Sequence, residues 1–473
     1  MTRVPCLTLL LLLCAALAGC AGTRVARDET TAASRMASVA DERSLAAAVS
    51  VADADGQLTH RERVAAIRKL GDEGRQTLLE RQLAALATFG ELQLHEGTRG
   101  ELLVDGPATF AAMFDAIARA RRTILLESYI IDDAEVSQAL ARLLAAKRAE
   151  GVLVAVIYDD IGSVTTPDGY FDALRRSGVM VCAFNPVSPL ERPGYWDITH
   201  RDHRKILVVD DRIAFTGGIN ISGVYASGSL RFGRGPHFER EVGWRDTQLQ
   251  LQGPAVEALA VLVRQTWLAQ GCEGEVPGFD PDQPAGGGRA GDDVAWVIAS
   301  SPDDERNRIY AMLLAAIDAS LASIHLTMAY FAPGEDMIAA LSDAARRGVQ
   351  VQLILPSRSD FRPVLYAGRS YYQRLLEAGV DIHEFEHAVL HAKTAVIDGV
   401  ISTVGSSNMD WRSFGGNNEV NVVVLGRDFA RQMEAMFQDD LAASRRITPE
   451  AWQERPLPER MLELLARLFE PLW

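Results

Sequence analysis

One short polar pattern occurs twice in this chain and constrains it more than any other feature. In each copy a lysine follows a histidine by two positions, an aspartate by seven and an asparagine by seventeen. The two copies are His203, Lys205, Asp210, Asn220 and His391, Lys393, Asp398, Asn408. The residues between lysine and aspartate are apolar in both, which predicts a buried strand with polar groups at its start. Histidine and lysine at i and i+2 then point to the same face of the strand. If the strands meet, two imidazoles and two ammonium groups surround one pocket.

Lysine usage supports an anion site in that pocket. Only four lysines occur among the 48 basic residues, and two of them are Lys205 and Lys393; the others are Lys69 and Lys147. A chain that uses arginine almost everywhere thus has lysine at both matched positions. An ammonium is a compact point charge that suits a phosphate oxygen.

The double pattern, H-x-K-x4-D-x6-G-[GS]-x-N, resembles the signature of the phospholipase D superfamily. Further segments resemble the bacterial cardiolipin synthase branch: residues 201–205, 217–220, 251–256, 405–410, 412–413 and 418–419. The similarity covers roughly residues 100 to 445. It implies an α/β protein made of two duplicated α/β/α sandwich halves, with pseudo-twofold symmetry and the active site at their interface.

The order of predicted elements agrees with a duplication. Apolar strand-like runs at 123–131 and 152–158 alternate with helical patterns, and runs at 322–327 and 349–355 repeat this order before the second motif. Alternating strands and helices predict sheets covered on both faces. We expect a signal peptide at 1–19, a tether at 20–60, an N-terminal helical segment at 61–100, a first half at 101–280 (motif 203–220), a linker at 281–293, a second half at 294–445 (motif 391–408) and a C-terminal helical tail at 446–473.

Phosphodiester chemistry needs a nucleophile, an acid for the leaving group and cations for the non-bridging oxygens. Two histidines can divide the first two tasks: a neutral imidazole attacks phosphorus, and a protonated one donates to the leaving alkoxide. The predicted phosphate donors are Lys205, Lys393, Asn220 and Asn408. No cofactor is expected, and no carboxylate cluster suggests a metal. The spacing does not show which histidine attacks; by resemblance, His203 is the nucleophile and His391 the acid, and the reverse is the alternative.

Each histidine also needs an acceptor on its far ring nitrogen to fix the tautomer. Glu419 lies 28 residues after His391, where the family places such a carboxylate. The residue at that offset in the first half is Arg231, which cannot accept, so Asp246 is the candidate there. By resemblance, Asp210 and Asp398 are structural and brace the two halves. Gly218 stands where the second half has Ser406, so the two half-sites are not equivalent.

The N-terminus predicts a cell envelope address. Residues 7–17 form an apolar run too short to span a bilayer, and Leu17-Ala18-Gly19-Cys20 resembles a bacterial lipobox. This implies cleavage before Cys20 and acylation of its sulfur, and Ala21 after it favours the outer membrane; an ordinary secretory signal is the alternative. The loops at 185–200 and 223–240, rich in aromatic residues and arginine, are expected to contact the bilayer.

Two further cysteines remain after such processing. In an oxidising periplasm Cys182 and Cys272 can form a disulfide, but Cys182 lies in an apolar run, so a buried free thiol is an equal alternative.

These features favour a phosphatidyltransferase of cardiolipin synthase type, which acts on phosphatidylglycerol at a membrane surface through a phosphohistidine. The first alternative is a phospholipase D that uses water as the acceptor. A nuclease shares the motifs, but the net charge of −15 argues against a nucleic-acid partner. A non-catalytic scaffold is disfavoured because both motifs are complete. Protein partners are not predicted.

Overall fold

The computed structural model describes residues 42–70, 76–88, 92–187, 199–229, 243–278, 285–304 and 307–470. The predicted signal peptide and the lipidation site at Cys20 lie outside these residues, as do most of the two loops predicted to contact the bilayer. Within the described part of the chain, no helix combines the length and the apolar character needed to cross a membrane.

The first half is built on a mixed sheet. Strands β4 (Thr123–Ser128), β5 (Leu153–Asp159) and β6 (Met180–Phe184) are parallel neighbours, and β8 (Lys205–Val209), β9 (Ile213–Gly217) and β10 (Thr247–Gln252) extend the sheet antiparallel from β4. Helices α6 (Asp105–Arg119), α7 (Glu135–Ala149) and α8 (Asp168–Arg176) pack on it with α9 (Ala255–Ala269). All of β4 and β8 is buried, as expected for continuous apolar runs covered on both faces.

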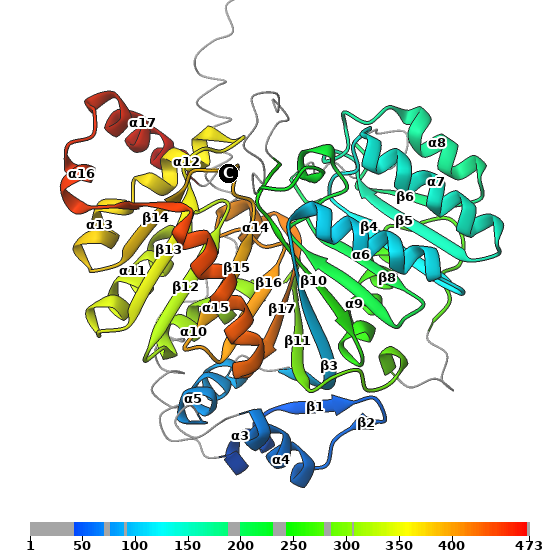
Figure 1. The fold of residues 1–473 in the computed structure, drawn as a ribbon, viewed down its shortest axis with the longest axis horizontal. Coiled ribbons are helices and arrows are strands. Elements are labelled where there is room, and N and C mark those ends of the chain that lie inside the picture. The colour runs from blue at the N-terminus through cyan, green and yellow to red at the C-terminus, as the bar shows by residue number, and fades with distance from the viewer. Residues whose placement is uncertain are drawn as a thin grey trace, which may run out of the picture.

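The second half repeats this arrangement. Strands β12 (Ser323–Met328), β13 (Gln350–Pro356) and β14 (Asp381–Phe385) are parallel, and β15 (Lys393–Ile397), β16 (Ile401–Gly405), β17 (Asn417–Leu425) and β11 (Asp293–Ser300) continue antiparallel. Its helices are α10 (Arg308–Ala319), α11 (Gly334–Arg346), α12 (Arg362–Arg369), α13 (Tyr372–Glu377) and α15 (Arg427–Ala442). The predicted duplication is therefore confirmed, and Figure 1 shows the halves side by side.

A long strand, β3 (Gln93–Val104), joins the halves into one sheet. It pairs with β10 through residues 99–104 and with β11 through residues 95–98. Apolar side chains from both halves pack into one core, which lies between this joined sheet and helices α9 and α15. The predicted boundary at residue 100 is wrong, because β3 starts inside the segment expected to be helical and serves both halves.

The predicted tether is also too long. Residues from 42 onward fold as α3 (Glu42–Ala48), β1 (Ser50–Asp53) and β2 (Gly56–Gln57), followed by α4 (His60–Leu70) and α5 (Gln76–Ala87). β1 pairs in parallel with β3, and Leu45, Val49 and Val51 are buried in the core of the second half. The folded part of the chain therefore includes residues 42–57 of the predicted tether.

The C-terminal tail is largely helical, as predicted. It begins with β18 (Ser444–Ile447), which pairs antiparallel with β14, and continues as α16 (Pro449–Gln453) and α17 (Leu457–Leu468).

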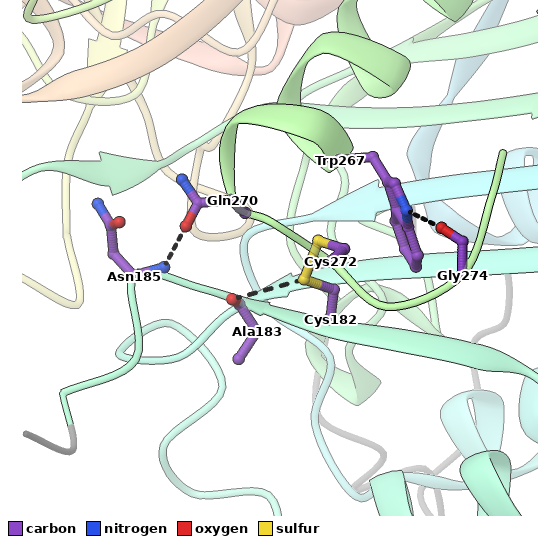
Figure 2. The surroundings of a disulfide bond; sticks show 7 residues. All are labelled: Cys182, Ala183, Asn185, Trp267, Gln270, Cys272 and Gly274. Carbon is purple, nitrogen blue, oxygen red and sulfur yellow. Dashed lines mark hydrogen bonds between the residues drawn. A yellow bond between two sulfur atoms is a disulfide. The ribbon is translucent and has the colours of Figure 1, made fainter. Parts of the chain in front are cut away.

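A disulfide joins Cys182 of β6 to Cys272, just beyond α9. Figure 2 shows the surrounding contacts, where the Asn185 amide donates to Gln270 Oε1 over 3.2 Å and Trp267 Nε1 donates to the Gly274 carbonyl over 3.0 Å. These bonds fix the end of β6 to the end of α9. Of the two sequence alternatives, the structure has the bonded one.

Removal of this disulfide should destabilise the first half. The bond closes a loop with a sequence separation of 90, and such a cross-link restricts the unfolded chain. We expect Cys182→Ser/Cys272→Ser to lower the free energy of unfolding in urea by about 2–4 kcal/mol. Reduction of the parent should cause the same loss and leave the double variant unchanged. Equal stability of parent and variant would contradict the structural role.

Candidate active site

The two motif histidines lie where the halves meet, and each is held by backbone bonds to the opposite half. The short strand β7 (Arg201–Asp202) pairs in parallel with the start of β17, and the His203 amide donates to the Asn418 carbonyl over 3.0 Å. In the matching bond, the His391 amide donates to the Arg245 carbonyl over 2.7 Å. Each motif therefore depends on the packing of the other half.

The carboxylates are exchanged in the same way. His203 Nδ1 lies 3.0 Å and 3.1 Å from the two carboxylate oxygens of Glu419, and His391 Nδ1 lies 2.7 Å from Asp246 Oδ2. Both carboxylates predicted from the sequence thus contact a motif histidine, but each contacts the one from the other half. A proton on Nδ1 that is donated to the carboxylate leaves Nε2 with its lone pair.

Burial sets the charge state of the two imidazoles. It lowers the pKa of His203 to about 4, although the Glu419 carboxylate opposes the shift. Burial and the Lys393 ammonium also lower the pKa of His391. Both histidines are therefore neutral near pH 7 before an anion binds.

Glu419 is held in its ionised form. Burial alone would raise its pKa, but His203, Lys205 and the Ser406 hydroxyl together lower it to about 2. Ser406 donates to one carboxylate oxygen, and Ser413 donates to the other over 2.8 Å.

The first half has no hydroxyl at the position of Ser406 because there is no room for one. A Cβ built at Gly218 would lie 2.1 Å from Asp246 Oδ1. Glycine at this position therefore lets Asp246 reach His391. This close approach explains the Gly218/Ser406 difference noted in the sequence.

The two motif lysines are buried beside the histidines. Nζ of Lys205 donates to the His203 carbonyl over 2.6 Å, and Nζ of Lys393 donates to the His391 carbonyl. Burial lowers the pKa of Lys205 to about 7 and the pKa of Lys393 to about 8. The Lys205 charge also lowers the pKa of His391, and that of Lys393 lowers the pKa of His203, so the two motifs share one electrostatic environment.

The asparagines differ from each other. Asn220 Oδ1 accepts from the Ile130 amide over 3.1 Å, and its Nδ2 donates to the Tyr225 hydroxyl over 3.3 Å. Asn408 is buried, and its Oδ1 has no protein partner among the described residues. Asn220 thus braces the first half-site, and the predicted contact of both asparagines with phosphate stays a prediction.

The motif aspartates act at the far end of the strands. Asp210 accepts from the amides of residues 121–123, and Asp398 accepts from those of residues 321–323. Each carboxylate thereby caps the start of the strand next to its own. Asp398 also accepts from Gln82 Nε2 of α5 over 3.0 Å. These bonds are structural, and the expected bracing of the two halves stays a prediction.

Four aromatic side chains that sequence reasoning did not assign to the site surround the histidines. The Tyr129 ring lies edge-on to His203, with centroids 4.9 Å apart, while Trp244, Tyr225 and Tyr330 lie 5.3 Å, 5.9 Å and 6.1 Å from the His391 ring. Tyr225 falls in a loop expected to contact the bilayer, but it is buried, and its hydroxyl lies 3.1 Å from His391 Nδ1. The only sequence signal for it was its place five positions after Asn220.

The histidines and lysines of the two motifs act on one another across the boundary between the halves. In the described part of the chain, no three His, Cys, Asp or Glu side chains come together in a group that could hold a metal ion. Two imidazoles and two ammonium groups can supply the nucleophile, the acid and the positive charge. Fold and site together define a duplicated, two-motif enzyme of phosphodiester chemistry.

Comparison with known proteins agrees with this class. A family model described as "Cardiolipin synthase, PLD-like domain" matches residues 113–227 and 313–441, one segment in each half. Cardiolipin synthase 2 of Bacillus anthracis is 34% identical over 386 residues, which is 81% of this chain and 72% of that protein. Cardiolipin synthase A of Pseudomonas putida (strain W619) is 33% identical over 393 residues, 82% of this chain and 78% of that protein. The chain belongs to this cardiolipin synthase family of the phospholipase D superfamily.

A solved structure shares the fold at low identity. Phosphatidylserine synthase of Haemophilus influenzae Rd KW20 superimposes with a TM-score of 0.59 at 11% identity, over 79% of this chain and 95% of that one. This similarity supports the duplicated α/β architecture.

The close approach at Gly218 can be tested with a reciprocal pair of variants. Gly218→Ser should displace Asp246 from His391 and lower kcat toward a phosphodiester with an alkyl leaving group, which needs an acid to leave, by about 100-fold, because misplaced groups lose most of their catalytic effect. Ser406→Gly removes one hydroxyl from Glu419 and should cost about tenfold. A Gly218→Ser enzyme within about threefold of the parent would contradict this explanation.

Binding of a phosphodiester should weaken as the pH rises. The ammonium forms of Lys205 and Lys393 are lost above pKa values of about 7 and about 8, so the pocket loses positive charge between pH 7 and pH 9. We expect the Kd of glycerophosphoglycerol, whose charge is constant there, to rise by about tenfold or more in titration calorimetry. Lys205→Met/Lys393→Met should flatten the profile and Lys69→Met, an exposed control, should not. A Kd of the parent that does not change between pH 7 and pH 9 would contradict the lowered pKa values of the two lysines.

Proposed function

We propose that this protein is a phosphatidyltransferase of cardiolipin synthase type. It takes a phosphatidyl group from one phosphatidylglycerol and passes it to the glycerol headgroup of a second. The observation that carries the proposal is the pair of buried histidines, each held by a carboxylate of the opposite half at the interface.

The first step forms a phosphohistidine. Nε2 of one neutral imidazole attacks phosphorus, a P–N bond forms, and the P–O bond to the headgroup glycerol breaks. The second histidine donates its proton to the leaving alkoxide, so glycerol departs neutral. The negative phosphodiester favours the imidazolium form of that second histidine, which offsets the effect of burial.

The second step reverses the roles. A hydroxyl of the incoming phosphatidylglycerol attacks the phosphohistidine, and the second histidine takes the hydroxyl proton. The P–N bond breaks, and the first imidazole is free again. Both ammonium groups lie beside the non-bridging oxygens in each step and stabilise the charge on them.

The asymmetry of the half-sites favours His203 as the nucleophile. Phosphorylated imidazole is cationic and needs a firmly ionised partner. Glu419 receives two serine hydroxyls, and its pKa is lowered to about 2, so it can stabilise that cation. His391 instead has the Tyr225 hydroxyl and Asp246 at its Nδ1, and it is assigned as acid and base.

We also propose that the protein is a lipoprotein of the bacterial cell envelope, acylated at Cys20 and held in the outer membrane. The lipobox-like residues 17–20 and Ala21 support this, and so does the disulfide, since such bonds persist in oxidising compartments. Two or more acyl chains anchor a protein stably.

Identification of the lipid products tests the activity. The full chain is incubated with vesicles of pure phosphatidylglycerol, and the lipids are analysed by mass spectrometry. We expect diphosphatidylglycerol and glycerol in equal amounts. Phosphatidic acid as the main product would show that the enzyme hydrolyses phospholipids as a phospholipase D and does not transfer the phosphatidyl group. The absence of any lipid product would contradict both activities.

Single histidine variants test the assignment in the same assay. His203→Ala and His391→Ala should each abolish product, while His60→Ala, an exposed control in α4, should not. With a phosphatidyl ester of p-nitrophenol, which needs no acid to leave, His391→Ala should accumulate a phosphoenzyme and His203→Ala should form none. The reverse pattern would make His391 the nucleophile.

A further inference from the structure

Helix α17 (Leu457–Leu468) presents its apolar side chains outward. Four of them are at least 63% exposed and form one stripe, with spacings of four, three and four residues along the helix. They are Leu457 (72%), Met461 (65%), Leu464 (63%) and Leu468 (66%). Leu462 and Leu465, at 44% and 50%, widen the stripe. A helix on the surface of a soluble protein normally turns such a stripe toward the core.

The inward face of α17 and the turn after it bury two carboxylates and only one small apolar side chain of the helix, Ala466. Glu463 is buried, and Arg455 donates to its carboxylate over 2.9 Å. Glu470 is also buried and accepts from the Tyr371 hydroxyl. These ion-pair and hydrogen-bond contacts fix the rotation of the helix, so the exposed stripe is built into the fold.

The helix that carries the stripe packs close to the active site through its inward face. Ala466 packs with Val364 and Ala367 of α12, and this small cluster also contacts Tyr330, whose ring faces His391. In Figure 1, α17 and α12 lie at the same end of the molecule as α14 (Trp411–Gly415), which follows the second motif, and α3 and α4 lie at the opposite end.

The first half adds apolar side chains along the same edge. Val164 (75% exposed) follows β5, Val187 (47%) follows β6, and Val224 (40%) precedes Tyr225. The carboxyl ends of parallel strands share one edge of a sheet, and His203 is placed at this edge by the pairing of Lys205 with Ser128 at the end of β4. Exposed apolar groups thus flank the site on both halves.

We propose that α17 is an interfacial helix that inserts its leucine stripe into the lipid bilayer and holds the mouth of the active site against the membrane surface. Amphipathic helices lie in the membrane plane with their apolar face roughly 5–10 Å into the headgroup boundary. The identity of the partner rests on the proposed function: an enzyme whose two substrates are both membrane lipids needs its site at the lipid surface.

Two other occupants would cover the same stripe. A second copy of the chain could pack α17 against α17, or a protein of the envelope could bind it. Lipid is favoured because exposed apolar groups lie on both halves at the strand ends that carry the histidines, where a tightly packed protein would block access of a lipid substrate.

A tryptophan placed on the stripe reports insertion directly. In the full chain, the fluorescence added by Leu464→Trp should be quenched when vesicles of phosphatidylglycerol and phosphatidylethanolamine carry brominated acyl chains. Leu321→Trp is the matched control, because Leu321 is 51% exposed at the amino end of β12, on the opposite edge. Its added fluorescence should not change. No quenching at 464, or equal quenching at both positions, would overturn the proposal, whatever anchors the N-terminus.

Loss of the stripe should affect only membrane-presented substrate. Met461→Gln/Leu464→Gln/Leu468→Gln should lower turnover of phosphatidylglycerol in vesicles by tenfold or more and leave turnover in detergent micelles within twofold. If light scattering shows that the parent is a dimer and this variant a monomer, the stripe is a contact between two copies of the chain. That result would refute the binding of lipid by the stripe. If the tryptophan at 464 is quenched but the parent forms no lipid product, the proposed function is refuted, while the insertion of α17 into the membrane is still supported.

Discussion

The site depends on an exchange of hydrogen bonds between the two halves of the chain. Glu419 of the second half holds the imidazole of His203, and Asp246 of the first half holds that of His391. The backbone repeats the exchange, since the amide of each histidine donates to a carbonyl of the opposite half. Neither half can therefore orient its own histidine, and the duplication works only as a closed pair.

Burial makes this exchange chemically useful. An imidazole removed from water gives up its proton more easily, so His203 is neutral and available as a nucleophile near pH 7. The same burial weakens the hold of Lys205 and Lys393 on their protons, which couples the charge of the pocket to the arrival of an anion. The half-sites then diverge through small residues: Ser406 adds a donor to Glu419, while Gly218 makes room for Asp246. A nearly symmetric scaffold thus gives two histidines different partners.

The sequence predicted the parts of the site that follow from local spacing. Histidine and lysine two positions apart on a strand must share a face, so both pairs and the duplicated fold could be predicted. The spacing could not show which carboxylate serves which histidine, because that depends on how the halves pack. Tyr225 was missed since it lies in a Gly- and Ser-containing turn without periodicity.

The strand β3 was missed because Gly97 and charged residues interrupt its apolar pattern. Helix α3 was missed because seven residues are too few to show an apolar stripe. The outward stripe of α17 depends on partners outside the helix, Arg455 and Tyr371, that no helical period reveals.

A crystal structure of the chain with bound tungstate, which mimics the phosphoryl group in the transition state of its transfer, tests the shared site most directly. We expect one tungstate between the halves, with Nε2 of His203 and Nε2 of His391 on opposite sides of the tungsten atom and both lysine ammonium groups on its oxygens. Two tungstates in separate cavities, each touching a single histidine, would contradict it.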